Sequence, residues 1–240
     1  AEVMRSEIGH MQTLKETLLT EGYTDVLLLG MGGSSLAPEV FSHTFKKTGG
    51  LRLQILDSTD PDMVLAREKS LDLSKTLCIV ATKSGGTAET LSAFKYFYNR
   101  VSKAVGKRKS GEHFVAITDL GSKLVDIAKQ YKFREIFLNE PNIGGRYSAL
   151  SFFGLLPAAL SGVQLPRLIA NASDMSAACG PQTQAQNNPA AVLGAVLGRF
   201  ANSGMDKITF TASPAIADFP NWVEQLIAES TGKEGKGILP

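Results

Sequence analysis

The sequence predicts a three-layer α/β/α fold around a five-stranded parallel sheet, followed by the start of a second α/β domain. Two observations lead to this prediction. Short apolar runs rich in Val, Leu and Ile alternate with helical stretches through the first half of the chain. Each run is too short for an ordinary helix and is bounded by Gly, Asp, Ser or Asn. Strands and helices that alternate in this way typically form right-handed parallel units, with helices on both faces of the sheet.

The expected elements of the first half follow from this alternation of short apolar runs and helical stretches. The expected strands are Asp25–Leu29, Leu51–Leu56, Thr76–Ala81, Phe114–Thr118 and Glu135–Leu138. Between them, apolar residues recur at helical spacing, most clearly after Thr87. The expected helices are Gln12–Thr20, Pro61–Leu71, Thr87–Val105 and Leu120–Lys129.

The pattern changes after Asn139. Ser148–Leu160 is expected to be an apolar helix that ends near Gly162. The elements expected after it are the helices Pro166–Ala178 and Pro189–Phe200, a strand Lys207–Thr211 and a helix Phe219–Ser230. We therefore expect one complete domain over residues 1–162, connecting helices over 163–205, and the beginning of a truncated second domain over 206–240.

Composition excludes several classes of protein. Hydrophobic residues make up 43% and charged residues 20%, as in ordinary globular chains, which excludes a disordered chain or a coiled coil. The net charge of +2 gives no general attraction to nucleic acid or to an anionic membrane. No apolar run approaches the length of a membrane span, and the N-terminal residues do not resemble a signal peptide. Cys78 lies in an apolar run and is expected to be reduced, which favours a cytoplasmic setting.

Two loops that follow predicted strands are candidates for binding an anion. In the turn Gly30–Ser35, the glycines let the backbone approach a ligand, and the next helix offers free amides. A dinucleotide fingerprint fails here because its third glycine position is Ser35. In the loop 82–87, three hydroxyls and Lys83 suit a phosphate monoester. The alternatives are an ordinary turn of small residues in the first case, and a helix cap at Thr87 in the second.

Two further segments are weaker candidates by themselves. Gly144 and Gly145 precede Arg146, so the guanidinium could be held against a ligand. Gln225 and Glu229 are four residues apart and share one face of the last predicted helix. From the residues alone, a surface arginine and a solvated helix end are the better interpretations.

Taken together and in this order, the four segments resemble the glucose-6-phosphate isomerase family. The likeness spans nearly the whole chain, and the last two motifs are the more specific. Its elements here are Gly32-Gly33-Ser34, Thr82-Lys83-Ser84-Gly85-Gly86-Thr87, Gly144-Gly145-Arg146-Tyr147-Ser148, and the Gln-x-x-x-Glu-Ser-x-Gly-Lys element from Gln225 to Lys233. The Gly85-Gly86 pair departs from the commonest family form and resembles the isomerase part of transaldolase–isomerase fusion proteins. The resemblance implies that residues 1–162 form a sugar-isomerase domain.

The resemblance also implies a role for each candidate residue. Glu229 is the base that moves a proton between the first two sugar carbons through an enediol(ate), and Arg146 stabilises the developing negative charge. Gln225 helps to position the substrate, and Lys83 contributes through its backbone amide. The implied substrate-binding residues are Gly33, Ser34, Thr82, Lys83, Ser84, Thr87, Gly145 and Gln225. No metal or organic cofactor is implied.

Part of the machinery implied by the resemblance has no counterpart. Members of this family open the sugar ring with a His from across a dimer interface and a Lys near the C-terminus, both well beyond the Glu-Ser-x-Gly-Lys element. The chain stops at Pro240, and His10, His43 and His113 lie in other contexts. We therefore expect an N-terminal part of a longer homodimeric isomerase, inactive by itself. A non-catalytic phosphosugar sensor and a dehydrogenase using Gly30–Ser35 with Asp57 are the alternatives.

Overall fold

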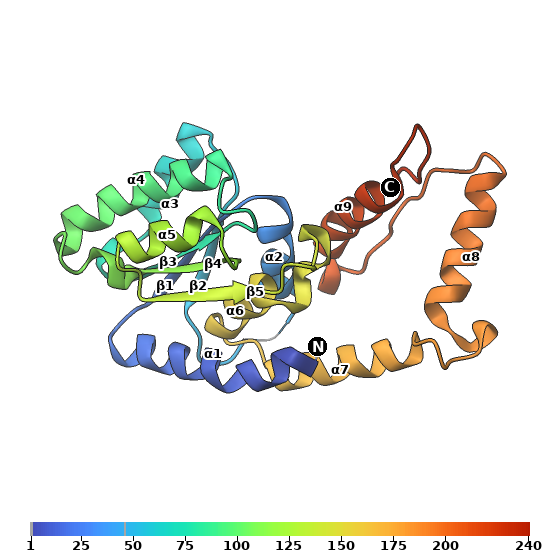
Figure 1. Cartoon of the computed structure of the whole chain (residues 1–240), viewed down its shortest axis with the longest axis horizontal. Coiled ribbons are helices and arrows are strands. Elements are labelled where there is room, and N and C mark those ends of the chain that lie inside the picture. The colour runs from blue at the N-terminus through green and yellow to red at the C-terminus, as the bar shows by residue number, and fades with distance from the viewer. Residues whose placement is uncertain (1, 46) are drawn as a thin grey trace.

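Five parallel strands form the centre of the structure, a computed structural model that describes residues 2–45 and 47–240. They lie in the order β2–β1–β3–β4–β5 (Figure 1). Their bounds are Asp25–Gly30 (β1), Arg52–Leu56 (β2), Thr76–Ala81 (β3), Phe114–Asp119 (β4) and Glu135–Asn139 (β5). The predicted parallel sheet is therefore confirmed, and every strand matches its prediction to within one residue at each end.

This strand order fixes where a ligand site can form. The chain runs outward from β1 to β2, returns to β3 on the other side of β1, and then continues in one direction. A crevice opens between the loops after β1 and β3, because they leave the sheet toward opposite faces. The register pairs Gly30 with Ala81 at this edge. The two Gly-rich loops of the sequence therefore begin side by side.

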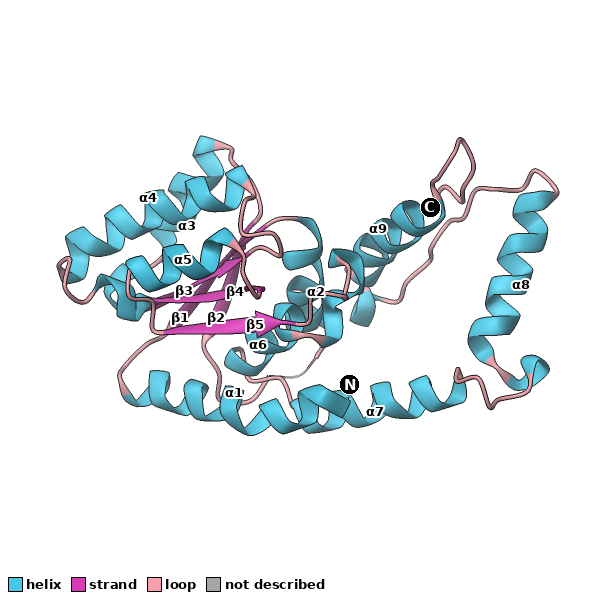
Figure 2. Ribbon diagram, in the orientation of Figure 1, coloured by secondary structure: helices cyan, strands magenta, loops and turns pink. Residues whose placement is uncertain are grey.

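Helices cover both faces of the sheet and confirm the three layers (Figure 2). One face carries α1 (Glu2–Thr20), α2 (Leu36–Thr44), α6 (Phe152–Leu160) and the start of α7 (Leu165–Ala178). The other carries α3 (Pro61–Ser70), α4 (Ala88–Val105) and α5 (Lys123–Gln130). Side chains alternate between the two cores along each strand: Val26 and Leu28 face the first group, and Leu27 and Leu29 the second.

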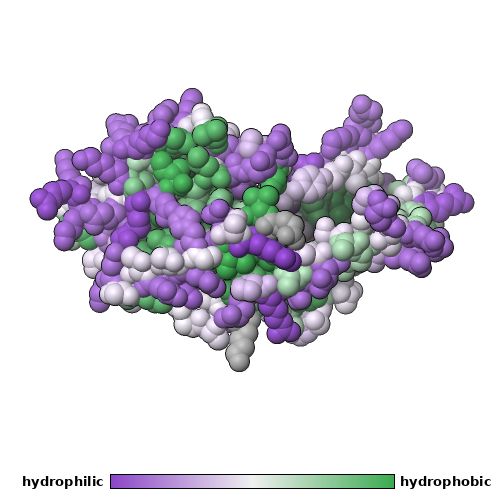
Figure 3. Space-filling view, turned by 60° about the horizontal axis from the view of Figure 1, so that its bottom comes forward, coloured by the Kyte–Doolittle hydropathy of each residue, from purple (hydrophilic) through white to green (hydrophobic). Residues whose placement is uncertain are grey.

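The remaining helices lie beyond the sheet. α8 (Pro189–Asn202) stands at the far end of the molecule from the sheet, and α9 (Phe219–Thr231) returns to pack beside α2 (Figure 1). On the face drawn in Figure 3, hydrophilic residues cover most of the surface, with hydrophobic patches between them. Within the described parts of the chain, no helix is both long and apolar enough to cross a membrane.

The prediction of a strand at Lys207–Thr211 is wrong. The segment forms only an isolated parallel bridge between Lys207 and Leu239, closed by hydrogen bonds from Ile208 to Leu239 (2.9 Å) and from Leu239 to Asp206 (2.7 Å). The composition of this run favours a strand, but a strand also needs a neighbour to pair with along its length. Among the described residues, the run finds only this short one.

Candidate functional site

A cavity of about 460 Å³ opens at the carboxyl edge of the sheet, between the loops after β1 and β3. It is lined by Met31, Gly33, Ser34, Ala81, Thr82, Lys83, Ser84, Thr87, Thr90, Asp119 and Gly145. The structure thus brings together the predicted residues of both Gly-rich loops with Gly145, which comes from a third loop. A separate cavity of about 360 Å³ between α3 and α4 has none of the predicted residues in its described lining.

The loop after β3 presents hydroxyls and backbone at the start of α4. Thr87 occupies the N-cap position, but its side chain makes no capping bond within the described chain, and its hydroxyl lies 2.8 Å from that of Thr82. Gly85 has a φ of +69°, and a Cβ there would lie 2.6 Å from the backbone nitrogen of Leu124. The loop is therefore pressed against the start of α5. The capping alternative for Thr87 receives no support, and no side chain of the described residues caps the first turn of α4 through Thr87.

The turn after β1 is locked to the loop that carries Arg146. A Cβ on Gly33 would lie only 2.5 Å from the carbonyl oxygen of Gly145, so the two backbones meet at a contact that only glycine permits. The Ser148 hydroxyl lies within hydrogen-bond distance of both carbonyls, 2.6 Å from that of Gly145 and 3.2 Å from that of Gly33. Two loops more than 100 residues apart in sequence therefore form one wall of the cavity.

Arg146 and Glu229 form an ion pair beside this wall. Nη1 of Arg146 donates to Oε2 of Glu229 at 3.1 Å, and its Nε donates to the Ser230 hydroxyl at 2.9 Å. The guanidinium carbon lies 4.7 Å from the centre of the Tyr147 ring, whose hydroxyl is 2.8 Å from that of Ser230. Tyr147 first, and then Glu229, raise the pKa of Arg146 above its ordinary value. The guanidinium is thus a permanent cation fixed against α9.

Gln225 lies one turn before Glu229 and contacts the turn after β1. Its Nε2 atom is 3.1 Å from the position that a Cβ on Gly32 would take. Its Oε1 atom is buried and has no hydrogen-bond partner among the described residues. α9 thus brings both of its predicted residues to the loops of the sheet domain.

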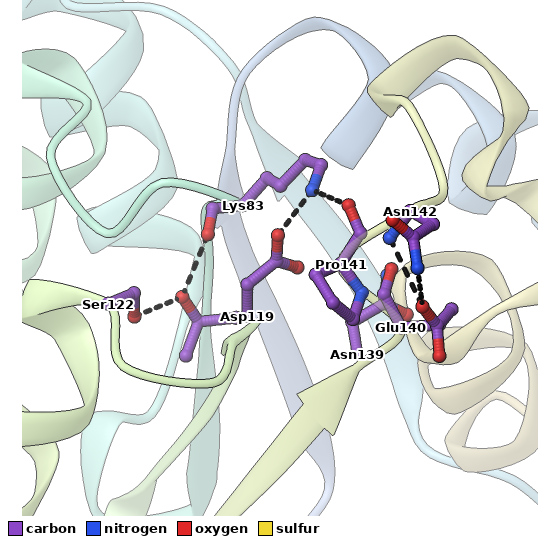
Figure 4. Close-up of polar contacts among 8 residues, drawn as sticks. Lys83, Asp119, Ser122, Asn139, Glu140, Pro141 and Asn142 are labelled. Carbon is purple, nitrogen blue, oxygen red and sulfur yellow. Dashed lines mark hydrogen bonds and ion pairs between the residues drawn. The ribbon is translucent and has the colours of Figure 1, made fainter.

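The sequence interpretation missed two residues with polar side chains that line the cavity. Thr90 follows Thr87 by three residues on α4 and is 2% exposed, and its hydroxyl has no partner in the described parts of the chain. The i, i+3 spacing of the two threonines was the available signal. Asp119 ends β4, and its carboxylate accepts a hydrogen bond from the ammonium of Lys83 (Figure 4). Its place at the carboxyl end of a third parallel strand was the signal there.

The histidines are engaged elsewhere. His10 pairs with Glu135, and His43 lies 2.7 Å from a carboxylate oxygen of Asp218. His113 is buried against the carbonyl of Thr76. Over residues 2–45 and 47–240, no three His, Cys, Asp or Glu side chains are grouped so that they could hold a metal ion.

Comparison with known proteins extends over almost the whole chain. Residues 9–237 match the family described as phosphoglucose isomerase. A glucose-6-phosphate isomerase from Cyanothece sp. is 37% identical over 219 residues, and one from Geobacter sp. is 36% identical over 228. In both cases the match covers 88% of this chain and 40% of the relative. The chain thus spans about 40% of the length of these curated relatives.

Solved structures show the same architecture. A hypothetical protein from Thermus thermophilus superposes with a TM-score of 0.88 at 27% identity, over 98% of this chain and 56% of that one. A glucose-6-phosphate isomerase from Chlamydia trachomatis has the same fold, with a TM-score of 0.81 at 24% identity over 98% of this chain and 46% of that one. Because the family match extends from residue 9 to residue 237, the chain belongs to the phosphoglucose isomerase family.

Proposed function

We propose that this chain supplies the phosphosugar site and the proton-transfer groups of a glucose-6-phosphate isomerase, which interconverts glucose 6-phosphate and fructose 6-phosphate through an enediol(ate). The contact between Arg146 and Glu229, beside a cavity lined with hydroxyls, carries this proposal. A phosphate sensor needs the hydroxyl loops alone. A carboxylate and a fixed guanidinium beside such a cavity are the groups that a proton transfer at a sugar carbon requires.

The phosphate would bind at the loop after β3. The Thr82, Ser84 and Thr87 hydroxyls and the first amides of α4 offer donors there, and Ser34 faces them from the loop after β1. The positive end of the α4 dipole favours an anion by roughly 0.3–1 kcal/mol. The volume of about 460 Å³ is within the usual range for small-molecule sites. Binding the unreactive phosphate would fix the reacting carbons beside α9.

The chemistry would take place between α9 and the loop that carries Arg146. Glu229 would remove the proton from C2 of the open-chain aldose and return it to C1. Arg146 would stabilise the charge that develops on the enediolate oxygens, and Gln225, one turn away, would orient the sugar. This assigns the chain to carbohydrate metabolism, in glycolysis and gluconeogenesis. We extend the proposal to a cytoplasmic location and a homodimeric full-length protein that needs no metal or organic cofactor. The cytoplasmic part is supported by the free, fully buried thiol of Cys78.

Hydrogen exchange at the reacting carbon tests the function without requiring the sugar ring to be opened by the protein. Fructose 6-phosphate in D₂O contains some open-chain form, and the enediol step replaces a hydrogen on C1 by deuterium. We expect this chain to accelerate the loss of the C1 proton signal in ¹H NMR above the rate in buffer. Binding of the sugar phosphate with exchange at the buffer rate would favour a sensor. A chain that neither binds the sugar phosphate nor accelerates the exchange would contradict both the isomerase and the sensor.

Thr90→Val separates a ligand role from a structural one. The buried hydroxyl has no partner in the described chain, so the isosteric valine should leave the midpoint of thermal unfolding unchanged or raise it. If the hydroxyl turns to a bound phosphate, phosphate affinity should fall by about two- to tenfold, the value of one neutral hydrogen bond. Calorimetric titration with inorganic phosphate measures this. Ser92→Ala, on the face of α4 that borders the other cavity, is the control. Unchanged affinity in Thr90→Val would remove Thr90 from the site.

A further inference from the structure

The side chain of Lys83 joins three parts of the carboxyl edge of the sheet. Its ammonium donates to a carboxylate oxygen of Asp119 at the end of β4, and to the carbonyl of Pro141, after β5, at 2.6 Å (Figure 4). Its own carbonyl accepts from the Asp119 amide at 3.2 Å and lies 3.3 Å from the Thr118 hydroxyl. Lys83 is thus fixed at both ends, and its charge is directed at protein atoms.

Asp119 makes that charge necessary. Its side chain is 15% exposed and belongs to the cavity lining, and its second oxygen, Oδ1, is buried without a partner in the described chain. A carboxylate at this place would repel a bound phosphate. Lys83 neutralises it, so the lysine and the aspartate together add no net charge to the cavity. The attraction for an anion then rests on the hydroxyls and the start of α4.

Pro141, which Lys83 contacts, lies five residues before Arg146 in the sequence. The backbone around them forms two tight turns: the Ile143 amide donates to the Glu140 carbonyl at 3.2 Å, and the Tyr147 amide to the Gly144 carbonyl at 2.9 Å. The Asn142 side chain donates to the carboxylate of Glu140 at 2.7 Å. Two successive hydrogen-bonded turns, 140–143 and 144–147, thus lead directly from Pro141 to Arg146. The position of Pro141 therefore bears on the position of Arg146.

We propose that Lys83 and Asp119 form a charge-neutral tether, which ties the hydroxyl loop to the segment carrying Arg146, and that the Lys83 ammonium takes no part in holding the phosphate. Both are positioning residues. The identity of the anion rests on the proposed function. The tether itself rests only on the contacts of the chain without ligand.

A double-mutant cycle read by phosphate affinity tests the charge balance. Lys83→Met leaves Asp119 unpaired in the cavity, and inorganic phosphate should then bind about tenfold or more weakly, as expected for a like charge within a few ångströms. Asp119→Asn should bind phosphate as well as the parent chain or better. The double variant should recover most of the loss seen in Lys83→Met. A double variant as weak as Lys83→Met would mean that the ammonium itself binds the phosphate, and would overturn the proposal.

A spectroscopic readout tests the tether without ligand. The ¹H–¹⁵N signal of the Arg146 Nε–H group should shift in Lys83→Met and in the double variant, because both lose the contact with Pro141. It should stay unchanged in Lys123→Met, which removes an exposed lysine at the start of α5. An unchanged Arg146 signal in Lys83→Met would overturn the tether. This result stands even if no variant binds phosphate, an outcome that would count against the proposed function alone.

One measurement covers the case in which Lys83→Met does not fold. The ¹⁵N ammonium signal of Lys83 in the parent chain, identified by its absence in Lys83→Arg, should persist unshifted when phosphate saturates the amides of the loop. A large shift on saturation would show direct contact and contradict the proposal.

Discussion

Replacing Glu229 by glutamine is expected to abolish hydrogen exchange at C1 of fructose 6-phosphate while leaving sugar-phosphate binding nearly intact. The amide has the size of the carboxylate and can still accept the hydrogen bond from Arg146, which is 3.1 Å in the parent chain. It cannot take up a proton. Losing a positioned general base costs about 10²- to 10⁴-fold in rate. The loss of the C1 proton signal in D₂O, with the affinity from calorimetry, separates the two effects.

Glu224→Gln provides the matched control for this experiment. Glu224 lies on the same helix, is exposed, and borders a surface hollow formed by residues 207–210 and the C-terminal residues. The change of charge is the same, but exchange should stay at the parent rate. Exchange in Glu229→Gln within about threefold of the parent rate would exclude Glu229 as the base, because that residual difference is far below the contribution of a general base.

Removing the guanidinium of Arg146 should have the second largest effect. Arg146→Leu keeps an apolar side chain but deletes the guanidinium, which lies over the Tyr147 ring and donates to Glu229 and Ser230. Removal of one donor that stabilises a developing oxyanion costs about 10²- to 10³-fold in rate. Arg146→Lys keeps the charge but not the planar fork, so it should be intermediate. The same C1 exchange assay measures all three chains.

Tyr147→Phe tests how far the geometry around Arg146 matters by itself. It keeps the ring beneath the guanidinium and removes only the hydroxyl that contacts Ser230. The rate should fall by less than about tenfold, in line with one neutral hydrogen bond. If Arg146→Leu were as active as the parent chain, Arg146 would have no part in the chemistry.

The sheet could be predicted because its signal is local. Each strand is an apolar run with polar ends, and the alternation of strands and helices restricts the topology to parallel units. The failure at Lys207–Thr211 shows where local signals end. That run has the composition of a strand, but pairing depends on a neighbour that the run itself does not encode.

In the candidate site too, some features could be predicted from local sequence signals and others could not. The loops after β1 and β3 could be found because the carboxyl ends of neighbouring parallel strands must meet. The pairing of Lys83 with Asp119 spans 36 residues and that of Arg146 with Glu229 spans 83. Neither pairing can be predicted from the spacing of residues that are close together in the sequence. The importance of Arg146 and Glu229 was predicted only from the resemblance of whole motifs to a family.

The route by which α9 reaches the sheet has a kinetic consequence. Between α6 and α9 the chain travels out through α7 and α8, which are joined by a largely exposed connection at residues 179–188 (Figure 1). A covalent path keeps the carboxylate of Glu229 at a high effective concentration beside Arg146. A single proteolytic cut in that connection would leave every atom of the site present. Arg146 and Glu229 would then lie on two separate fragments that must associate, and the rate of the C1 exchange would fall with dilution.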